Sequence, residues 1–84
     1  MRYRESGQTA WCEGTVINMS RSGVLFHAAS EVEPKNTLEL EILFPSEDPP
    51  TNVLCWGTAV RIEKLQPPDT RPAVAVAISG YRFA

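Results

Sequence analysis

The chain has 84 residues, which is enough for one small domain and too few for two independent ones. Its hydrophobic fraction of 43% and charged fraction of 21% are ordinary for a globular protein, so they exclude disordered, collagen-like and coiled-coil chains. A formal net charge of -2, with only eight basic residues, argues against binding to duplex nucleic acid. We therefore expect residues 1–84 to form a single domain.

Apolar residues recur at every second position along most of the chain, and this period predicts strands. In chain order, the expected strands cover 2–4, 9–18, 23–28, 37–44, 53–65 and 73–79. The proline-rich segments 45–50 and 66–72 separate the later strands and are expected to be loops, because proline cannot donate to a ladder. No segment of ten or more residues shows a helical stripe. The pattern favours an all-β fold, a small antiparallel barrel of five or six strands with little or no helix.

Two details of the later strands predict how the barrel closes. Gly57 lies in the middle of a long alternating stretch, which favours a bulge that lets the sheet curl. Strand 53–65 places Leu54, Trp56, Val60 and Ile62 on one side and Cys55 on the other. Alanines line one side of strand 73–79, which permits close packing or a flat ligand.

The sequence offers little catalytic or metal chemistry. Cys12 and Cys55 are far apart and form no C-x-x-C pair, so we expect two buried thiols, no metal and no cofactor. His27 is the only histidine, and no serine or acidic residue is spaced to work with it. Ser20 lacks the preceding glycine of a nucleophile elbow. We expect a protein that is not an enzyme.

The ends and apolar runs of the chain bear on localisation. Residues 1–6 have no apolar stretch like that of a signal peptide. The longest uninterrupted apolar run covers 73–78, far short of the roughly 18 residues that a membrane helix needs. We expect a cytoplasmic protein that does not insert into membranes.

The segment between the second and third expected strands carries the most specific pattern. Asn18, Ser20 and Gly23 follow the spacing [D/N]-x-S-x-x-G. Turn chemistry alone can explain it, because Asn and Ser bond to nearby backbone and Gly adopts a positive φ. The same polar groups could also contact a ligand.

Residues 14–26 (GTVINMSRSGVLF) resemble the signature region of PilZ domains. Residues 55–61 (CWGTAVR) resemble the later glycine-bearing strand of this family, and residues 75–83 (AVAISGYRF) resemble its closing strand. The resemblance covers nearly the whole chain. It implies a six-stranded barrel and a bacterial regulatory module that binds cyclic di-GMP.

The resemblance also implies roles for individual residues. Asn18 and Ser20 would hydrogen-bond to guanine or phosphate, and Gly23 would keep the turn open for close approach. The family's R-x-x-x-R arm is not found here ahead of the first strand, and we expect weaker nucleotide affinity without it. Arginine binds phosphate and guanine edges in a bidentate manner, so other arginines could replace the contacts of this arm. The candidates, weaker than Asn18, Ser20 and Gly23, are Arg2, Arg4 and Arg21.

Two alternatives remain at this stage. The chain could be a divergent PilZ barrel that works as a nucleotide-independent interaction domain, with a protein partner or as part of a larger signalling protein. It could also be an unrelated barrel that binds single-stranded nucleic acid through Trp11, Phe26 and Trp56. The low basic charge and the expected burial of these rings count against the second alternative.

Overall fold

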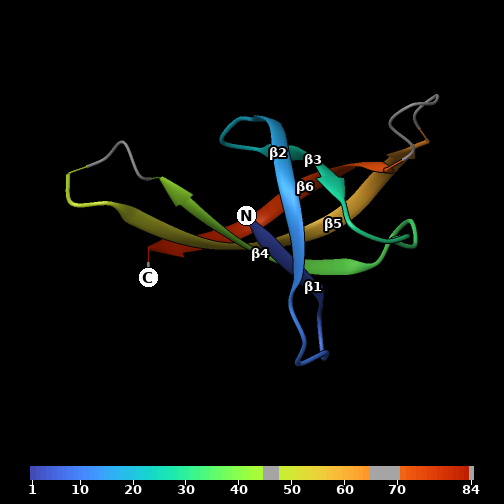
Figure 1. The fold of residues 1–84 in the computed structure, drawn as a ribbon, viewed down its shortest axis with the longest axis horizontal. Coiled ribbons are helices and arrows are strands. Elements are labelled where there is room, and N and C mark those ends of the chain that lie inside the picture. The colour runs from blue at the N-terminus through green and yellow to red at the C-terminus, as the bar shows by residue number, and fades with distance from the viewer. Residues whose placement is uncertain (45–47, 65–70, 84) are drawn as a thin grey trace.

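The computed structural model describes residues 1–44, 48–64 and 71–83, and these form strands connected by turns without any helix (Figure 1). The strands are β1 (Arg2–Glu5), β2 (Cys12–Met19), β3 (Gly23–Ala28), β4 (Thr37–Phe44), β5 (Thr51–Glu63) and β6 (Ala73–Phe83). The bounds of β3 and β4 are those predicted. The two expected loops over 45–50 and 66–72 fall partly on positions 45–47 and 66–70, which lie outside the described residues.

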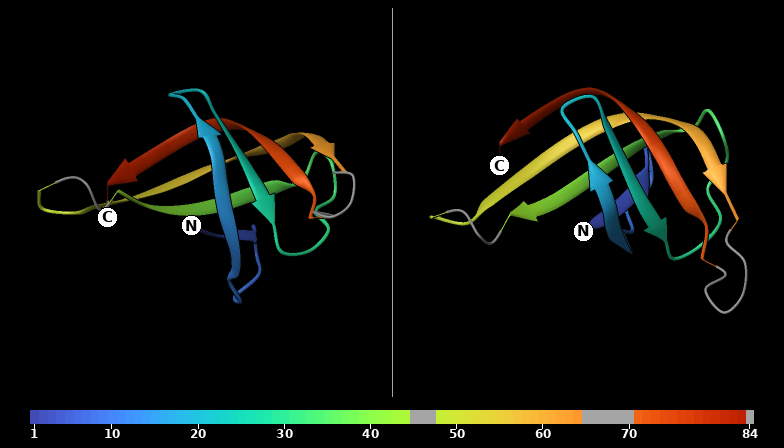
Figure 2. Two further views of the ribbon diagram at one scale, coloured as in Figure 1. Left: turned by 45° about the horizontal axis from the view of Figure 1, so that its top comes forward. Right: turned by 90° about the horizontal axis from the view of Figure 1, so that it is seen from above.

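The six strands close into an antiparallel barrel in the order β1-β2-β3-β6-β5-β4, which confirms the expected all-β fold. The β2–β3 hairpin crosses the longer strands, and the end of β4, the start of β5 and the end of β6 project together beyond it (Figures 1 and 2). All six strands therefore surround a core in one part of the barrel. In the other part, β4, β5 and β6 extend beyond the β2–β3 hairpin.

The core lies where all six strands meet. Its fully buried large side chains come from β3, β4 and β6, and are Phe26, Leu38, Leu40, Val74 and Val76. Tyr3 of β1 packs on Phe26 with 5.1 Å between ring centroids. The Tyr3 hydroxyl accepts hydrogen bonds from the backbone N–H groups of Ala29 and Ser30, at 3.0 and 3.3 Å. A buried tyrosine thus keeps its polar atom satisfied at the edge of an apolar core.

A register shift at Gly57 confirms the expected irregularity at this glycine, but the extra residue is Ser79 of β6 and not a residue of β5. The β5–β6 register shifts between Trp56 and Gly57, where a Cβ would overlap the backbone carbonyl of Ala77. Glycine is required here because the two backbones approach so closely.

A second register shift between β5 and β6 has its extra residue in β5, and it changes which residues of β5 face the core. It lies between Ala59 and Arg61, so Val60 is exposed and Ile62 packs against the core. The expectation that Trp56, Val60 and Ile62 share one face is therefore wrong, because a bulge reverses the alternation that follows it. Trp56 faces outward and is 39% exposed.

Candidate functional site

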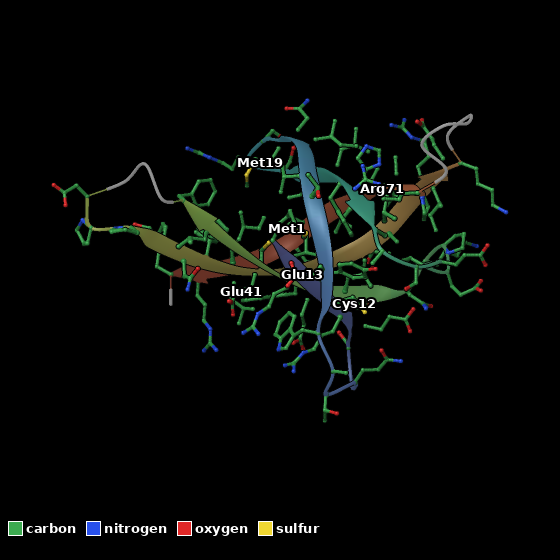
Figure 3. All side chains as sticks on the ribbon, viewed as in Figure 1. Met1, Cys12, Glu13, Met19, Glu41 and Arg71 are labelled. Carbon is green, nitrogen blue, oxygen red and sulfur yellow. The ribbon has the colours of Figure 1, made fainter. Side chains whose placement is uncertain are left out.

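A groove of about 590 Å³ opens where the β2–β3 turn faces the projecting ends of β4, β5 and β6. The described residues that line it are Met19, Ser20, Arg21, Val24, Phe44, Thr51, Val53, Cys55, Ile78, Tyr81 and Phe83. Figure 3 shows Met19 at the tip of the β2–β3 hairpin, above the sheet. Most of the lining is apolar, and Arg21 is the one charged side chain among the described residues that form it.

Two aromatic rings at the end of β6 form part of the groove wall. Tyr81 and Phe83 lie on the same face of β6 because they are two residues apart. Their ring centroids are 6.1 Å apart and the ring planes meet at 82°. Both side chains are open to solvent, with exposed fractions of 53% for Tyr81 and 70% for Phe83. The pair offers aromatic surface to a planar or apolar ligand.

The β2–β3 turn is fixed by its own backbone and by β6. The Ser20 N–H donates to the Gly23 carbonyl at 2.8 Å, and the Ile78 N–H donates to the Ser22 carbonyl at 2.9 Å. The hydroxyl groups of Ser20 and Ser22 are 3.5 Å apart. This arrangement holds Ser20 and Arg21 at the groove, so two of the sequence-predicted site residues come together there.

The other two residues of the signature lie differently. Asn18 is an exposed residue of β2 opposite Leu25, it does not line the groove, and its side chain makes no hydrogen bond within the described residues. Gly23 begins β3 and its φ is not positive, so the expected turn conformation is wrong. A Cβ at Gly23 would meet the Val76 carbonyl at 3.2 Å. The glycine therefore serves the close approach of β3 to β6.

Arg2 and Arg4 lie away from the groove and are bound to carboxylates of β4. The Arg2 guanidinium donates to both carboxylate oxygens of Glu41 at 3.1 and 3.0 Å. Arg4 Nε donates to Glu39 at 2.8 Å. Both guanidinium groups also lie over the Trp11 ring, at 4.6 and 4.3 Å from its centroid. These two arginines therefore already have anionic partners on β4 and an aromatic partner in Trp11.

The two cysteines and the histidine have distinct environments. Cys55 is buried at the groove, and desolvation by this burial raises the pKa of its thiol. Cys12 is only half-buried, so the expectation that both thiols are buried is correct for Cys55 alone; neither forms a disulfide. His27 Nδ1 is buried and has no hydrogen-bond partner among the residues that the structure describes. Within residues 1–44, 48–64 and 71–83, no three His, Cys, Asp or Glu side chains are placed to hold a metal ion.

Comparison with known proteins returns no match to any family model, to any curated protein or to any solved structure. The described part of the chain also has no helix whose length and apolar character would let it cross a membrane. The resemblance to PilZ domains therefore stands on the residues of segments 14–26, 55–61 and 75–83.

Sequence reasoning missed the aromatic half of the groove. Tyr81 and Phe83 alternate with Arg82 directly after Ser79 and Gly80, which predicts that β6 continues past its expected end at residue 79. This signal was available in the sequence. The position of the rings opposite the β2–β3 turn was not, because it depends on how far β6 extends beyond β3.

Proposed function

We propose that the chain is a PilZ-like regulatory binding module of the cyclic di-GMP receptor type, acting in the bacterial cytoplasm, with its ligand site in the groove. The observation that carries the proposal is that Ser20 and Arg21 of the signature line the same groove as the exposed rings of Tyr81 and Phe83. A cyclic dinucleotide needs both kinds of contact, since it has anionic phosphates and flat bases.

In this proposal each of these residues has its own role. The Arg21 guanidinium forms charge-assisted hydrogen bonds with a phosphate or a guanine edge. The Ser20 hydroxyl donates to or accepts from the same ligand. Tyr81 and Phe83 provide the surface on which a base stacks, a contact worth about 1–3 kcal/mol per base.

Nucleotide affinity is expected to be modest. Among the residues that the structure describes, Arg21 is the single cation lining the groove, whereas cyclic di-GMP carries two phosphates. Recruiting Arg2 or Arg4 would first break their contacts with Glu41 and Glu39. Each charge-assisted contact that is not made costs about 1.5–3 kcal/mol, or roughly a tenfold to hundredfold loss of affinity.

Calorimetric titration of the full chain with cyclic di-GMP, with GMP as the control ligand, tests the proposal. We expect saturable binding that Arg21→Ala weakens by about tenfold to a hundredfold. Arg82→Ala is the matched control, because it removes the same charge from a β6 residue that does not line the groove. A flat trace, or equal weakening by both variants, contradicts a nucleotide site at this groove.

A second candidate function is a nucleotide-independent protein-interaction domain. It is favoured by the large apolar side chains that the barrel leaves exposed at the groove, namely Met19, Tyr81 and Phe83. Exposed apolar surface of this kind is typical of interaction sites. This candidate predicts that cyclic di-GMP does not bind and that a protein ligand does.

A further inference from the structure

We propose that the edge of β6 at Ser79–Phe83 pairs with an extended peptide strand of a partner protein, whose alternate side chains are apolar and which carries an acidic residue that contacts Arg21. The inference goes beyond nucleotide binding and does not depend on it, because it rests on the backbone of β6 as well as on the groove.

The first observation is an unpaired strand edge. β3 pairs with β6 only from Ala73 to Ala77, and the Ile78 N–H bond to Ser22 is the last contact on that side. On its other side, β6 stays paired with β5 as far as Phe83. Within the described residues, no strand lies on the β3 side of Ser79–Phe83. Such an edge offers backbone donors and acceptors to an incoming strand.

The second observation is the apolar surface beside this edge. Tyr81 and Phe83 project from the segment into the groove, and Met19 and Val24 line it on the side of the β2–β3 hairpin. A strand added next to β6 continues the sheet, so every second side chain of that strand points into the groove. Apolar residues at those positions would form cross-strand pairs with the two rings.

The third observation is the positive charge of Arg21, which lines the groove. Arg21 is exposed and has no ion-pair partner among the residues described. An acidic residue in the incoming strand would supply that partner. A second copy of this chain pairing through the same edge would not, because Ser79–Phe83 contains no acidic residue and brings Arg82 instead. Charge complementarity therefore favours a different, acidic partner strand.

Two end-blocked fluorescent probes test the inference, the peptide Glu-Thr-Val-Thr-Val-Thr, in which Glu lies on the same face as the Val residues, and its counterpart with Lys in place of Glu. Titration of each probe with the full chain, without nucleotide, is followed by anisotropy. We expect the Glu peptide to bind about tenfold more tightly than the Lys peptide, as one charged contact predicts. Arg21→Ala should remove this preference, and Arg82→Ala should retain it.

The contribution of backbone hydrogen bonds to peptide binding needs its own control. Methylating the amide nitrogens of two consecutive central residues blocks both edges of the peptide and leaves its side chains in place. We expect this analogue to bind at least about tenfold more weakly, because edge pairing requires those amides. Hydrogen exchange should show that backbone amides within Ser79–Phe83 become protected when the unmodified Glu peptide is present.

Three results would overturn the inference. These are no binding of the Glu peptide up to about 1 mM, equal binding of the methylated analogue, or protection confined to other strands. None of them depends on cyclic di-GMP, so a failed nucleotide titration and a failed peptide titration are separate outcomes.

Discussion

Around Tyr3 and Phe26, strands close on every side of the inward-facing side chains, and Phe26 has no exposed surface. At the end of β6, Tyr81 and Phe83 occupy inward-facing positions of the same barrel and remain 53% and 70% exposed. The two regions have the same alternation of side chains along their strands. They differ in whether a facing strand is present.

The cause of this difference is the unequal length of neighbouring strands. β3 begins at Gly23, opposite Ala77, whereas β6 runs on to Phe83 and stays paired with β5 to that residue. The extra length of β6 has a hydrogen-bonded neighbour on one side and no facing layer of sheet. Inward-facing aromatic residues stabilise the fold where the barrel closes, and they are available to a ligand where it does not.

Replacement of one ring in each region should show the largest contrast. Phe26→Ala removes a fully buried ring and leaves a cavity, so we expect a loss of about 3–5 kcal/mol in the free energy of unfolding. Phe83→Ala removes a ring that is mostly in water, and we expect a change within about 0.5 kcal/mol. Urea denaturation of both variants measures the difference.

The milder variant Phe26→Leu keeps this comparison usable if Phe26→Ala does not fold, because it removes less buried volume. Equal destabilisation by Phe26→Leu and Phe83→Ala would show that the end of β6 is covered in solution and that the groove is closed.

Local pattern was sufficient to predict most of the fold. Strand 37–44 was predicted from its strict alternation and strand 23–28 from its β-rich composition, and both have the predicted bounds. The register shift at Gly57 was predicted from a glycine within an otherwise regular strand, although its extra residue, Ser79, lies in β6. The second shift, between Ala59 and Arg61, has no glycine to mark it, so the face of Ile62 was predicted wrongly.

The candidate site was predictable only in part, because a site combines residues from strands distant in sequence. Ser20 and Arg21 could be selected from the turn motif alone. The contacts of Arg2 and Arg4 with Glu41 and Glu39 depend on the β1–β4 register, which no local pattern specifies. From the sequence, Arg2 and Arg4 were therefore candidates to contact a nucleotide. In the structure, both guanidinium groups are paired with carboxylates of β4.

The ion pair of Arg4 with Glu39 should contribute less to the free energy of unfolding than the Phe26 ring does. Both side chains are mostly buried, at 28% and 29% exposed, and Arg4 also stacks on Trp11. We expect Glu39→Gln to lower the free energy of unfolding by about 0.5–1 kcal/mol, less so in 1 M salt. The control is Glu63→Gln, which breaks the more exposed pair with Arg61 and should have almost no effect. Equal effects in urea denaturation would contradict the proposed difference between the two pairs.

The smallest expected effect concerns Cys55, and it is confined to alkaline pH. Burial raises the pKa of this thiol above its ordinary value of 9.0, so the unfolded chain releases the thiol proton at a lower pH than the folded chain does. The stabilising contribution is therefore complete below the unfolded pKa and is lost as the pH rises through the folded pKa. Cys55→Ala should remove this part of the alkaline loss of stability.

Alkylation of the folded protein provides the direct measurement, with Cys12 as the internal control. The thiolate is the reactive form, so the half-buried Cys12 should be alkylated faster than Cys55 at about pH 8. Comparable rates for the two thiols, measured by mass spectrometry under native conditions, would mean that the floor of the groove opens to solvent. In that case the contrast between a closed core and an open groove would not extend down to Cys55.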